Sequence, residues 1–483
     1  MTPHPLAHVS TRRLVASSLV LFSLLSGGCY NLAHRLPPGV SYRGEIHRAS
    51  EASFLADLTW VDESGERHVE QQIFDAVMRI IDHAERFVLV DMFLYNDFQG
   101  DPPETTREIS SELTSALIAR KRERPEIQIV VISDPVNTLY GGIRSKHFER
   151  MREAGIPVVL TRLDRLRDSN PGYSGFWRLL AKPFGVREGG MLPNPFGGEK
   201  VSTLSYLALL NFKANHRKLI IADAGDDMVA LVTSANPHDG SSAHGNVALQ
   251  FNGPAVLDLL ESERAVLELS DAELPPIELP ELAETSEGPF SLQIVTEGQI
   301  RRVLLDQIAA TGKGDRVEIA VFYISDHGVV KALVEARRRG ALVRALLDPN
   351  KDAFGREKGG IPNRPVASDL RKGDVAVRWC DTHGEQCHAK LLLVRRASGE
   401  SVLVLGSANF TRRNLQDLNL ETDVVVRGPA TSAPIRDAAE WLDLLWENEP
   451  SRFFSVDYEA YSNESLRKQF LYEIEERTGM STF

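Results

Sequence analysis

The sequence predicts an α/β protein in which one unit occurs twice, each copy with a largely parallel or mixed sheet. Two observations predict this class. Apolar strands alternate with helices along most of the 483 residues, which is typical of a sheet covered by helices on both faces. Five features also occur in the same order in both halves of the chain. Such an ordered recurrence indicates an internal duplication.

Composition narrows the class further. The chain is 42% apolar and 25% charged, with 35 Gly and 25 Pro, which excludes a disordered, collagen-like or multi-span membrane protein. Its length predicts two to four domains at roughly 100–200 residues each. A net charge of −12 argues against a general nucleic-acid binder, although a small basic site on an acidic body remains compatible with it.

The N-terminus has the pattern of an export signal. Arg12 and Arg13 precede an apolar run, Leu14–Leu25, which ends in small residues followed by Cys29. The run is too short to cross a bilayer comfortably but fits a cleaved signal. It resembles a bacterial lipoprotein signal, in which Cys29 becomes the lipidated N-terminus. An ordinary cleaved signal is the alternative, and a twin-arginine signal is a weaker one.

The repeated unit can be followed element by element. Each copy opens with an amphipathic helix and an apolar strand, continues with a second helix, and then has a buried strand ending in Asp-Pro. In the first copy these are Gln71–Ala84, Phe87–Tyr95, Ser110–Lys121 and Ile127–Ile132 before Asp134-Pro135. In the second copy they are Gln299–Ala310, Arg316–Ile324, Gly328–Arg339 and Leu342–Leu347 before Asp348-Pro349.

Each copy then presents His-x-Lys at the start of an apolar strand, and Ser-Ala-Asn after the next strand. The first pair begins at His216 and Ser234, and the second at His388 and Ser407. Residues two apart on a strand face the same side, so each motif places an imidazole beside an ammonium. If the copies meet around a twofold-like axis, two imidazoles, two ammonium groups and two amides converge on one pocket.

That set of groups suits a phosphodiester. One imidazole can attack phosphorus to give a phosphohistidine while the other protonates the leaving alkoxide. The lysines and the asparagine amides can bind the non-bridging oxygens as negative charge develops on them. Because cationic side chains neutralise this charge, no metal and no cofactor is expected.

These residues resemble the phospholipase D superfamily, whose signature is H-x-K-x4-D followed by G-S-x-x-N or G-S-x-N. The resemblance covers about residues 70 to 447. It implies two α-β-α sandwich domains with mixed sheets related by a pseudo-twofold axis, and a site between them. It also implies a nucleophile in the first half and a general acid in the second. The matching residues are His216, Lys218 and Asp223, then His388, Lys390 and Gly406-Ser407-Ala408-Asn409.

The chain departs from the family pattern at three places. Arg395 replaces the aspartate of the second motif, and Thr233 replaces the first glycine before Ser234. The family often places an acidic residue about twelve positions after the asparagine, where it orients a histidine. Glu421 occupies that place in the second copy.

In the first copy the corresponding position is Ala248, with Asp239 or Asp223 as possible substitutes. His388 is therefore expected to have the clearer carboxylate support, and the roles of the two histidines could be reversed. The candidate catalytic residues are His216, Lys218, Asp223, His388, Lys390, Asn236, Asn409 and Glu421, and the candidate substrate-binding residues are Ser234 and Ser407.

The copies differ in one gap, since 82 positions separate Asp134 from His216 but only 40 separate Asp348 from His388. The first copy thus carries an insertion, about 163–210, whose aromatic and Pro/Gly-rich content suits a lid, a membrane-touching surface or a packed excursion. The expected organisation is a signal peptide over 1–29, an N-terminal extension over 30–69, a first domain over 70–272, a linker over 273–290, a second domain over 291–449 and a tail over 450–483.

Two further groups carry alternatives. Cys380 and Cys387, with His383 and His388, could form a zinc cluster or, in an oxidising envelope, a disulfide that braces the approach to the second motif. The disulfide is favoured, because a metal would block His388. Asp348–Asp352 resembles a calcium loop, but a turn after a strand is the simpler interpretation.

The expected function is a lipid-anchored, periplasm-facing enzyme of the bacterial cell envelope. It would hydrolyse or transfer the phosphatidyl group of a membrane phospholipid through a phosphohistidine, in a cardiolipin-synthase-like reaction. Its expected partners are a phospholipid and the membrane, with no obligatory nucleic acid and an open oligomeric state. One alternative is a phosphodiesterase acting on nucleic acid, which the net charge disfavours. The other is a non-catalytic envelope scaffold, a class that includes a duplicated fold whose site is catalytically dead.

Overall fold

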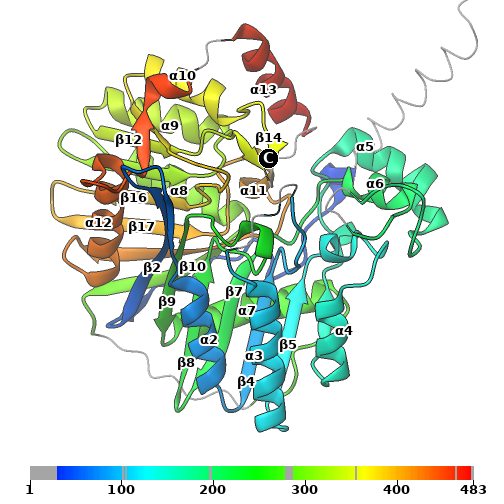
Figure 1. The fold of residues 1–483 in the computed structure, drawn as a ribbon. Helices are drawn as coiled ribbons and strands as arrows, with labels where there is room; N and C mark the ends of the chain where they lie inside the picture. The colour runs from blue at the N-terminus through cyan, green and yellow to red at the C-terminus, as the bar shows by residue number, and fades with distance from the viewer. Residues whose placement is uncertain are drawn as a thin grey trace, which may run out of the picture.

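The computed structural model describes residues 30–100, 103, 106–194, 198–277, 287–353, 356–462 and 465–479. Two mixed sheets form its framework (Figure 1). The predicted signal peptide, with Cys29, lies outside the described residues, as does part of the predicted linker. Within the described parts, no helix has the length and apolarity needed to span a bilayer.

The first sheet has eight strands in the order β3-β2-β9-β8-β7-β4-β5-β6. Its strands are β2 (Ala52–Val61), β3 (Arg67–Glu70), β4 (Phe87–Met92), β5 (Gln128–Ser133), β6 (Val158–Leu160), β7 (Lys218–Ala224), β8 (Asp227–Thr233) and β9 (Asn246–Asn252). The central strands read as continuous apolar runs because helices and the second half of the protein cover both faces of the sheet.

The second sheet has nine strands in the order β1-β10-β18-β17-β16-β11-β12-β15-β19. Its strands are β1 (His47–Ala49), β10 (Phe290–Thr296), β11 (Arg316–Val321), β12 (Leu342–Leu347), β15 (Ala376–Cys380), β16 (Lys390–Arg395), β17 (Glu400–Gly406), β18 (Thr422–Pro429) and β19 (Ser455–Asp457). A short separate hairpin joins β13 (Asp352–Ala353) to β14 (Arg356–Glu357).

Seven consecutive strands correspond between the sheets. In the order of the sheets, the run β2-β9-β8-β7-β4-β5-β6 matches the run β10-β18-β17-β16-β11-β12-β15. Every neighbouring pair has the same parallel or antiparallel sense in both runs. The predicted α/β class, with mixed sheets in two copies of one unit, is confirmed.

Helices cover the sheets in corresponding positions. They are α2 (Ile73–His83), α3 (Ile109–Glu123), α4 (Lys146–Glu153) and α7 (Ala255–Leu269) in the first half, and α8 (Gly298–Ala309), α9 (His327–Arg338), α10 (Asn363–Lys372) and α12 (Ala433–Glu447) in the second. In α2, apolar residues recur every three or four positions, so one side of the helix is buried against the sheet. Figure 1 shows α2, α3 and α4 on the same face of the first sheet.

The helices α7 and α12 join the halves. Helix α7 contacts β8 and β9 of its own half and β10 of the other, while α12 contacts β16, β17 and β18 of its own half and β2 of the other. Apolar side chains from both halves therefore form one shared core. Burying one core between the copies holds them in a fixed mutual position.

The flanking segments also belong to the sheets. Residues 30–69, expected as an extension, include β2, which occupies in the first sheet the place of β10 in the second, and β1, which pairs with β10 itself. The expected C-terminal tail supplies β19 at a sheet edge and the helix α13 (Leu466–Thr478). The first sheet thus begins before the expected boundary at residue 70.

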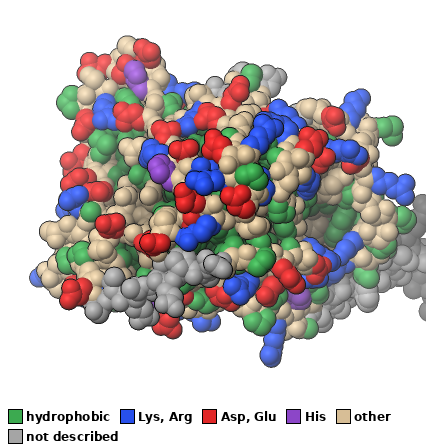
Figure 2. Space-filling model, turned by 90° about the horizontal axis from the view of Figure 1, so that it is seen from below, with side chains coloured by type: hydrophobic (Ala, Val, Ile, Leu, Met, Phe, Trp, Pro, Cys, Tyr) green, Lys and Arg blue, Asp and Glu red, His purple; other side chains and the backbone are tan. Residues whose placement is uncertain are grey.

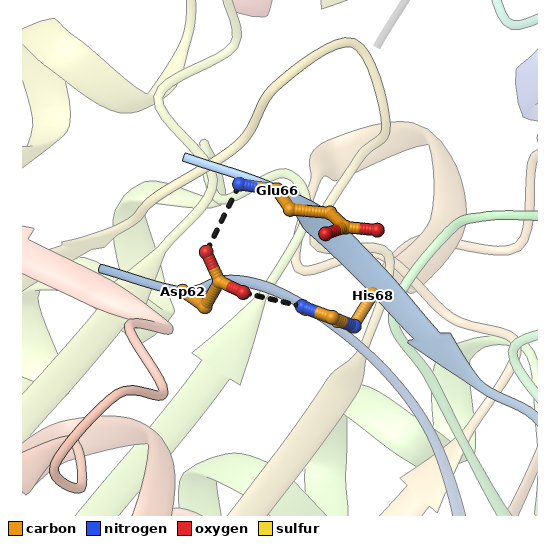
Figure 3. Close-up of side chains that lie close together, drawn as sticks. All are labelled: Asp62, Glu66 and His68. Carbon is orange, nitrogen blue, oxygen red and sulfur yellow. Dashed lines mark hydrogen bonds and ion pairs between the residues drawn. The ribbon is translucent and has the colours of Figure 1, made fainter. Parts of the chain in front are cut away.

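The turn between β2 and β3 gathers Asp62, Glu66 and His68 (Figure 3). One Asp62 carboxylate oxygen accepts hydrogen bonds from Ser64 and from the Glu66 amide, and the other lies 2.8 Å from His68 Nε2. The hydrogen bonds from Ser64 and His68 hold the pKa of Asp62 below its usual value. The cluster therefore has a structural role, because the carboxylate closes the hairpin.

Arg217 is a fully buried ionic link between the halves. Its guanidinium lies 2.7 Å from Glu263 in α7 and 2.7 Å from Glu297 beside α8, and both carboxylates are also fully buried. Glu297 additionally accepts a hydrogen bond from the Glu421 amide at 3.0 Å. This link fixes the backbone that carries Glu421.

Replacing Arg217 with alanine is expected to lower the free energy of unfolding by about 3–5 kcal/mol, because it leaves two buried carboxylates without a counterion. Urea denaturation measures this change. Arg436→Ala, which removes an exposed arginine, is the matched control and is expected to change the free energy of unfolding far less, because exposed ion pairs contribute little to stability. Equal costs for the two variants would show that the buried link does not stabilise the fold.

Candidate active site

The two His-x-Lys motifs lie at the seam between the halves. His216 lies two residues before the first residue of β7, and its amide donates to Leu420 O of the second half at 2.9 Å. His388 lies two residues before the first residue of β16, and its amide donates to Gly245 O of the first half at 2.7 Å. Each histidine is thus positioned by backbone pairing with the other copy, and both line the same cavity.

The Asp-Pro turns hold the residue before each histidine. Asp134 accepts from the Asn215 amide at 2.7 Å, and Asp348 accepts from the Cys387 amide at 2.8 Å. The other oxygen of each carboxylate caps its own turn. Burial raises the pKa of Asp134 to about 7 and that of Asp348 to about 6. Because backbone amides occupy its carboxylate, Asp348 acts as a turn residue, not as part of a calcium loop.

Each imidazole packs against a phenylalanine of its own half. The ring centroids of His216 and Phe93 are 4.7 Å apart, and those of His388 and Phe322 are 4.9 Å apart. The ammonium groups of Lys218 and Lys390 lie 5.1 Å and 5.2 Å from the same two rings. Each lysine also donates to the carbonyl of its own histidine at 2.6 Å. The sequence signal for these phenylalanines was their matching position just after β4 and β11.

Glu421 orients the histidine of the other half. Its Oε2 lies 3.0 Å from Nδ1 of His216 and accepts a hydrogen bond from Ser407 at 2.5 Å, while Asn414 donates to its other oxygen. The expectation that Glu421 supports His388 is therefore wrong. The segments before β9 and β18 cross the seam, so each orienting side chain reaches the opposite copy.

Asn246 is the counterpart of Glu421. Its Oδ1 lies 3.1 Å from Nδ1 of His388 and accepts from Ser234 at 3.0 Å. Its amide nitrogen donates to His244 O at 2.9 Å, which fixes the amide orientation. The sequence counting missed this residue because it follows Asn236 by ten positions, whereas Glu421 follows Asn409 by twelve.

Three predicted site residues have other positions or roles. Asp223 lies near the far end of β7, where its carboxylate accepts the amides of Glu85, Arg86 and Phe87. It therefore stabilises a loop and does not reach either histidine. Ser234 and Ser407, expected to bind substrate, instead hold Asn246 and Glu421. Asp239, the other proposed substitute, accepts from the amide of Ser110.

The two halves enclose a cavity of about 370 Å³. His216, His388, Asn236 and Asn409 line it, and Asn409 Oδ1 is buried without a hydrogen-bond partner among the described residues. Further lining residues, which the sequence did not single out, are Phe93, Tyr140, Phe212, Lys213, His244, Phe322, Tyr323, Lys358 and Arg413. The cavity thus combines aromatic walls with a polar centre, a common property of ligand sites.

Burial controls the charge of the site. It lowers the pKa of His216 to about 4, even though the Glu421 carboxylate acts in the opposite direction. Burial and the nearby Lys390 ammonium also lower the pKa of His388 well below its usual value. Burial lowers the pKa of Lys218 to about 7 and that of Lys390 well below its usual value. The site is therefore poised to gain positive charge when an anion enters it.

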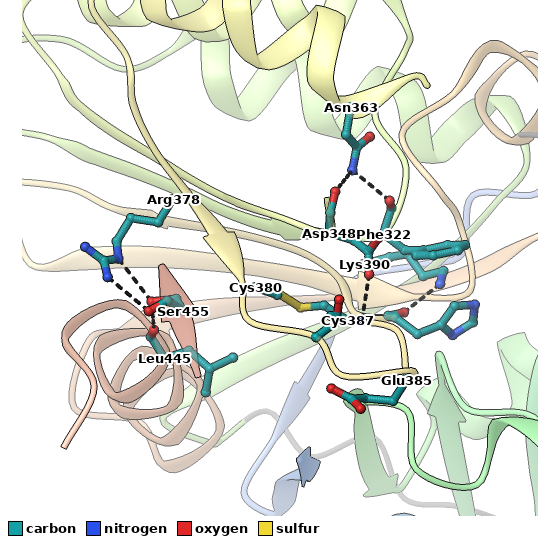
Figure 4. The surroundings of a disulfide bond; sticks show 12 residues. Phe322, Asp348, Asn363, Arg378, Cys380, Glu385, Cys387, Lys390, Leu445 and Ser455 are labelled. Atoms are coloured by element: carbon teal, nitrogen blue, oxygen red, sulfur yellow. Dashed lines mark hydrogen bonds between the residues drawn. A yellow bond between two sulfur atoms is a disulfide. The ribbon is translucent and has the colours of Figure 1, made fainter. Parts of the chain in front are cut away.

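Cys380 and Cys387 form a disulfide, with their Cα atoms 6.2 Å apart (Figure 4). It links the end of β15 to the residue before His388. The amide of Cys387 also donates to Asp348, whose carbonyl is held by Asn363. Because both sulfur atoms are in the disulfide, they cannot be zinc ligands. The bond braces the approach to the second motif, as the favoured interpretation expected.

The fold and this site define a duplicated α/β protein with a histidine–lysine centre between its copies. Residues 304–443 match the family model described as the cardiolipin synthase PLD-like domain. No curated protein matches the sequence significantly. The matched part of the chain, which contains the second His-x-Lys motif and Glu421, is thus similar to a phospholipase D-like domain.

One solved structure has a similar fold, and two others are similar at lower TM-scores. Phosphatidylserine synthase of Haemophilus influenzae Rd KW20 is 11% identical, with a TM-score of 0.56 over 94% of this chain and 97% of that one. Polyphosphate kinase of Porphyromonas gingivalis is 13% identical, with a TM-score of 0.46 over 89% of this chain and 53% of that one. The phospholipase D family member Nuc of Salmonella typhimurium is 18% identical, with a TM-score of 0.26 over 34% and 97%.

Proposed function

We propose that this protein hydrolyses or transfers the phosphatidyl group of a membrane phospholipid through a phosphohistidine. The observation that carries the proposal is the meeting of both imidazoles and both asparagines around one cavity, with the lysine of each motif held to the carbonyl of its own histidine. A phosphodiester needs a nucleophile, a proton donor and a cationic cradle for its oxygens. This cavity offers each of them from two equivalent strands.

In the first step, Nε2 of His216 attacks phosphorus. The new P–N bond forms as the P–O bond to the leaving alkoxide breaks, and Nε2 of His388 gives that alkoxide its proton. In the second step, His388 takes a proton from water or an alcohol. The resulting oxygen nucleophile attacks phosphorus and releases His216. Lys218, Lys390, Asn236 and Asn409 stabilise the charge on the non-bridging oxygens in both steps.

The assignment of His216 as nucleophile follows from the difference between the two orienting side chains. An imidazole that attacks phosphorus becomes positively charged, and the Glu421 carboxylate at 3.0 Å stabilises that charge. Asn246 is neutral, so it orients His388 without stabilising its cation to the same degree. His388 therefore serves as the proton donor.

A phospholipid fits the surroundings better than a nucleic acid. The predicted lipid anchor at Cys29 would hold the enzyme at a membrane of the cell envelope, facing the periplasm. Aromatic side chains line the cavity, and basic and acidic side chains are interspersed on the face shown in Figure 2. A nucleic-acid backbone normally requires a continuous basic groove, whereas a single lipid phosphodiester requires only the local cationic centre.

The pH profile of kcat/KM tests these roles, because it reports the free enzyme. Activity needs neutral His216 and protonated His388. As pH rises through the lowered pKa of His388, the protonated fraction falls and kcat/KM falls with it. Protonation of His216, whose pKa is about 4, limits the acidic side. We therefore expect an optimum below pH 6.5.

Asn246→Asp is expected to shift the alkaline limb of that profile upward by about 1–3 units, because a carboxylate beside His388 favours its cation. Asn252→Asp, at the other end of β9, is the matched control and is expected to leave the limb in place. An unmoved limb in Asn246→Asp would contradict the role of His388 as proton donor.

The substrate class is tested by incubating the purified full chain separately with phosphatidylglycerol, phosphatidylethanolamine and single-stranded DNA, without added metal. Mass spectrometry then identifies the products. We expect headgroup release or phosphatidyl transfer from lipid, lost in His216→Ala and His388→Ala. Lipid turnover that survives both substitutions, or cleavage of DNA alone, would contradict the proposal.

A further inference from the structure

Exposed large apolar side chains are concentrated on three segments of the described chain. Twelve of the fifteen such residues lie on the turn after residue 30, on the insertion between Pro171 and Phe212, and on α13. Single exposed apolar residues are normal on a protein surface, but a concentration indicates an interaction site. The twelve are Leu32, Phe176, Leu179, Leu180, Phe184, Met191, Leu192, Leu210, Leu466, Phe470, Leu471 and Ile474.

The insertion contains the helical segments α5 (Pro171–Phe176), η3 (Trp177–Ala181), η4 (Lys182–Phe184) and α6 (Thr203–Leu209). Its inner side is attached to the body, since Arg178 forms an ion pair with buried Asp168 at 2.7 Å. Its outer side leaves Phe184 70% exposed and Met191 89% exposed. The insertion is thus anchored from within and apolar outside.

The first described residues are held against the base of the insertion. Tyr30 donates to Asp164 O at 3.1 Å, and its ring lies 4.0 Å from the Arg178 guanidinium. Asn31 donates to Asp168 O at 2.9 Å. Cys29, the predicted lipidation site, is the residue directly before Tyr30. A lipid attached there would therefore start from the side of the molecule that carries the insertion.

A basic pocket of about 390 Å³ lies beside this N-terminal turn. Arg167, Arg301, Arg302 and Arg412 line it together with Asn31. Gly479, at the end of α13, lies against Ser169 and Arg412 and so brings that helix to the same region. The insertion adds to the local charge, with four Lys/Arg and two Asp/Glu in residues 171–212 of a chain whose net charge is −12. Arginines bind phosphate groups well.

The catalytic cavity reaches the same region. A second cavity, of about 550 Å³, lies under the insertion and shares Tyr140 and Lys213 with the catalytic cavity. Trp177 and Lys182 of the insertion also line this second cavity. A lipid whose phosphodiester lies at the histidines would thus have space that leads toward the exposed apolar side chains.

We propose that the apolar side chains named above and the arginine pocket form one docking face, which binds an anionic phospholipid bilayer, namely the membrane that holds the anchor. Figure 1 shows α5 and α6 at the upper right of the molecule and α13 at its top. Apolar side chains enter the acyl boundary while the arginines contact the headgroups. The docking face deepens the proposed function, on which it rests for its substrate and its anchor.

The test measures depth in the membrane and not turnover. The full chain with His216→Ala receives a new tryptophan at either Phe184→Trp, on the docking face, or Leu342→Trp, an exposed leucine outside it. Each protein is mixed with phosphatidylglycerol-containing vesicles whose acyl chains carry bromine, which quenches nearby tryptophan. Because both proteins share the same N-terminus, the anchor contributes equally to both.

We expect the added fluorescence to be quenched at position 184 by at least half and to remain at position 342. Adding Arg302→Gln to Phe184→Trp is expected to raise the lipid concentration needed for half-maximal quenching roughly fivefold. Equal quenching at both positions, or none at 184, would overturn the docking face. Equal affinity for pure phosphatidylcholine vesicles would overturn its preference for anionic lipid. Either outcome leaves the catalytic proposal untouched, since these chains do not turn over substrate.

Discussion

His216→Ala is expected to lower kcat toward phospholipid on the order of 10⁵-fold, because it removes the atom that forms the covalent bond to phosphorus. The loss should appear in kcat more than in KM, since Lys218, Lys390 and both asparagines still line or support the cavity. Steady-state turnover of lipid vesicles, followed by mass spectrometry, measures it.

The matched control is His147→Gln. His147 is another buried histidine of the first half, but it bonds to Ser110 and Thr114 and does not line the cavity. Its replacement is expected to change stability, with kcat within about threefold of wild type once the folded fraction is taken into account. A kcat for His216→Ala close to that of this control would remove His216 from the mechanism.

Glu421→Gln is expected to lower kcat roughly 10³–10⁴-fold, by analogy with other sites in which a carboxylate fixes the tautomer of a catalytic histidine. The carboxylate accepts the Nδ1 proton of His216 and leaves Nε2 free to attack. An amide cannot stabilise the positive charge that develops on the ring during the attack. The same assays measure this loss, and the pH dependence of kcat shows whether the titration of His216 has changed.

Glu385→Gln is the matched control, because Glu385 is also buried in the second half but its carboxylate accepts from Arg67 and the His383 amide. We expect a small effect on kcat there. If Glu421→Gln behaved like this control, or if Asn246→Ala were much more damaging than Glu421→Gln, the roles of the two histidines would have to be exchanged.

Much of the fold could be predicted because its signals are local and repeated. The helix and strand elements recur in both copies, and the His-x-Lys and Ser-x-Asn motifs mark matched strand ends. The strand β2 could not be recognised, because β3 and not the opening helix α2 follows it in the chain. Its place depends on pairing with β9, about 190 residues later, and no local pattern reports such a pairing.

The residues that orient the two histidines could not be assigned without the three-dimensional structure. Glu421 belongs to the motif of the second copy, so sequence reasoning assigned it to His388. The backbone pairing of His216 with Leu420 carries it instead to the first histidine. Asn246 begins β9 after a loop of different length and so escaped a search at fixed spacing. The sequence of a duplicated site between two copies thus reveals its histidines, but not which side chain orients which histidine.

Trapping of the covalent intermediate tests the central claim most directly. In His388→Ala, a phosphatidyl substrate with a p-nitrophenol leaving group needs no proton donor for the first step, but the second step lacks its base. We predict a burst of one p-nitrophenolate per protein and a phosphatidyl adduct on the peptide that contains His216, identified by mass spectrometry. An adduct on another residue, or steady turnover without a burst and without an adduct, would contradict the account.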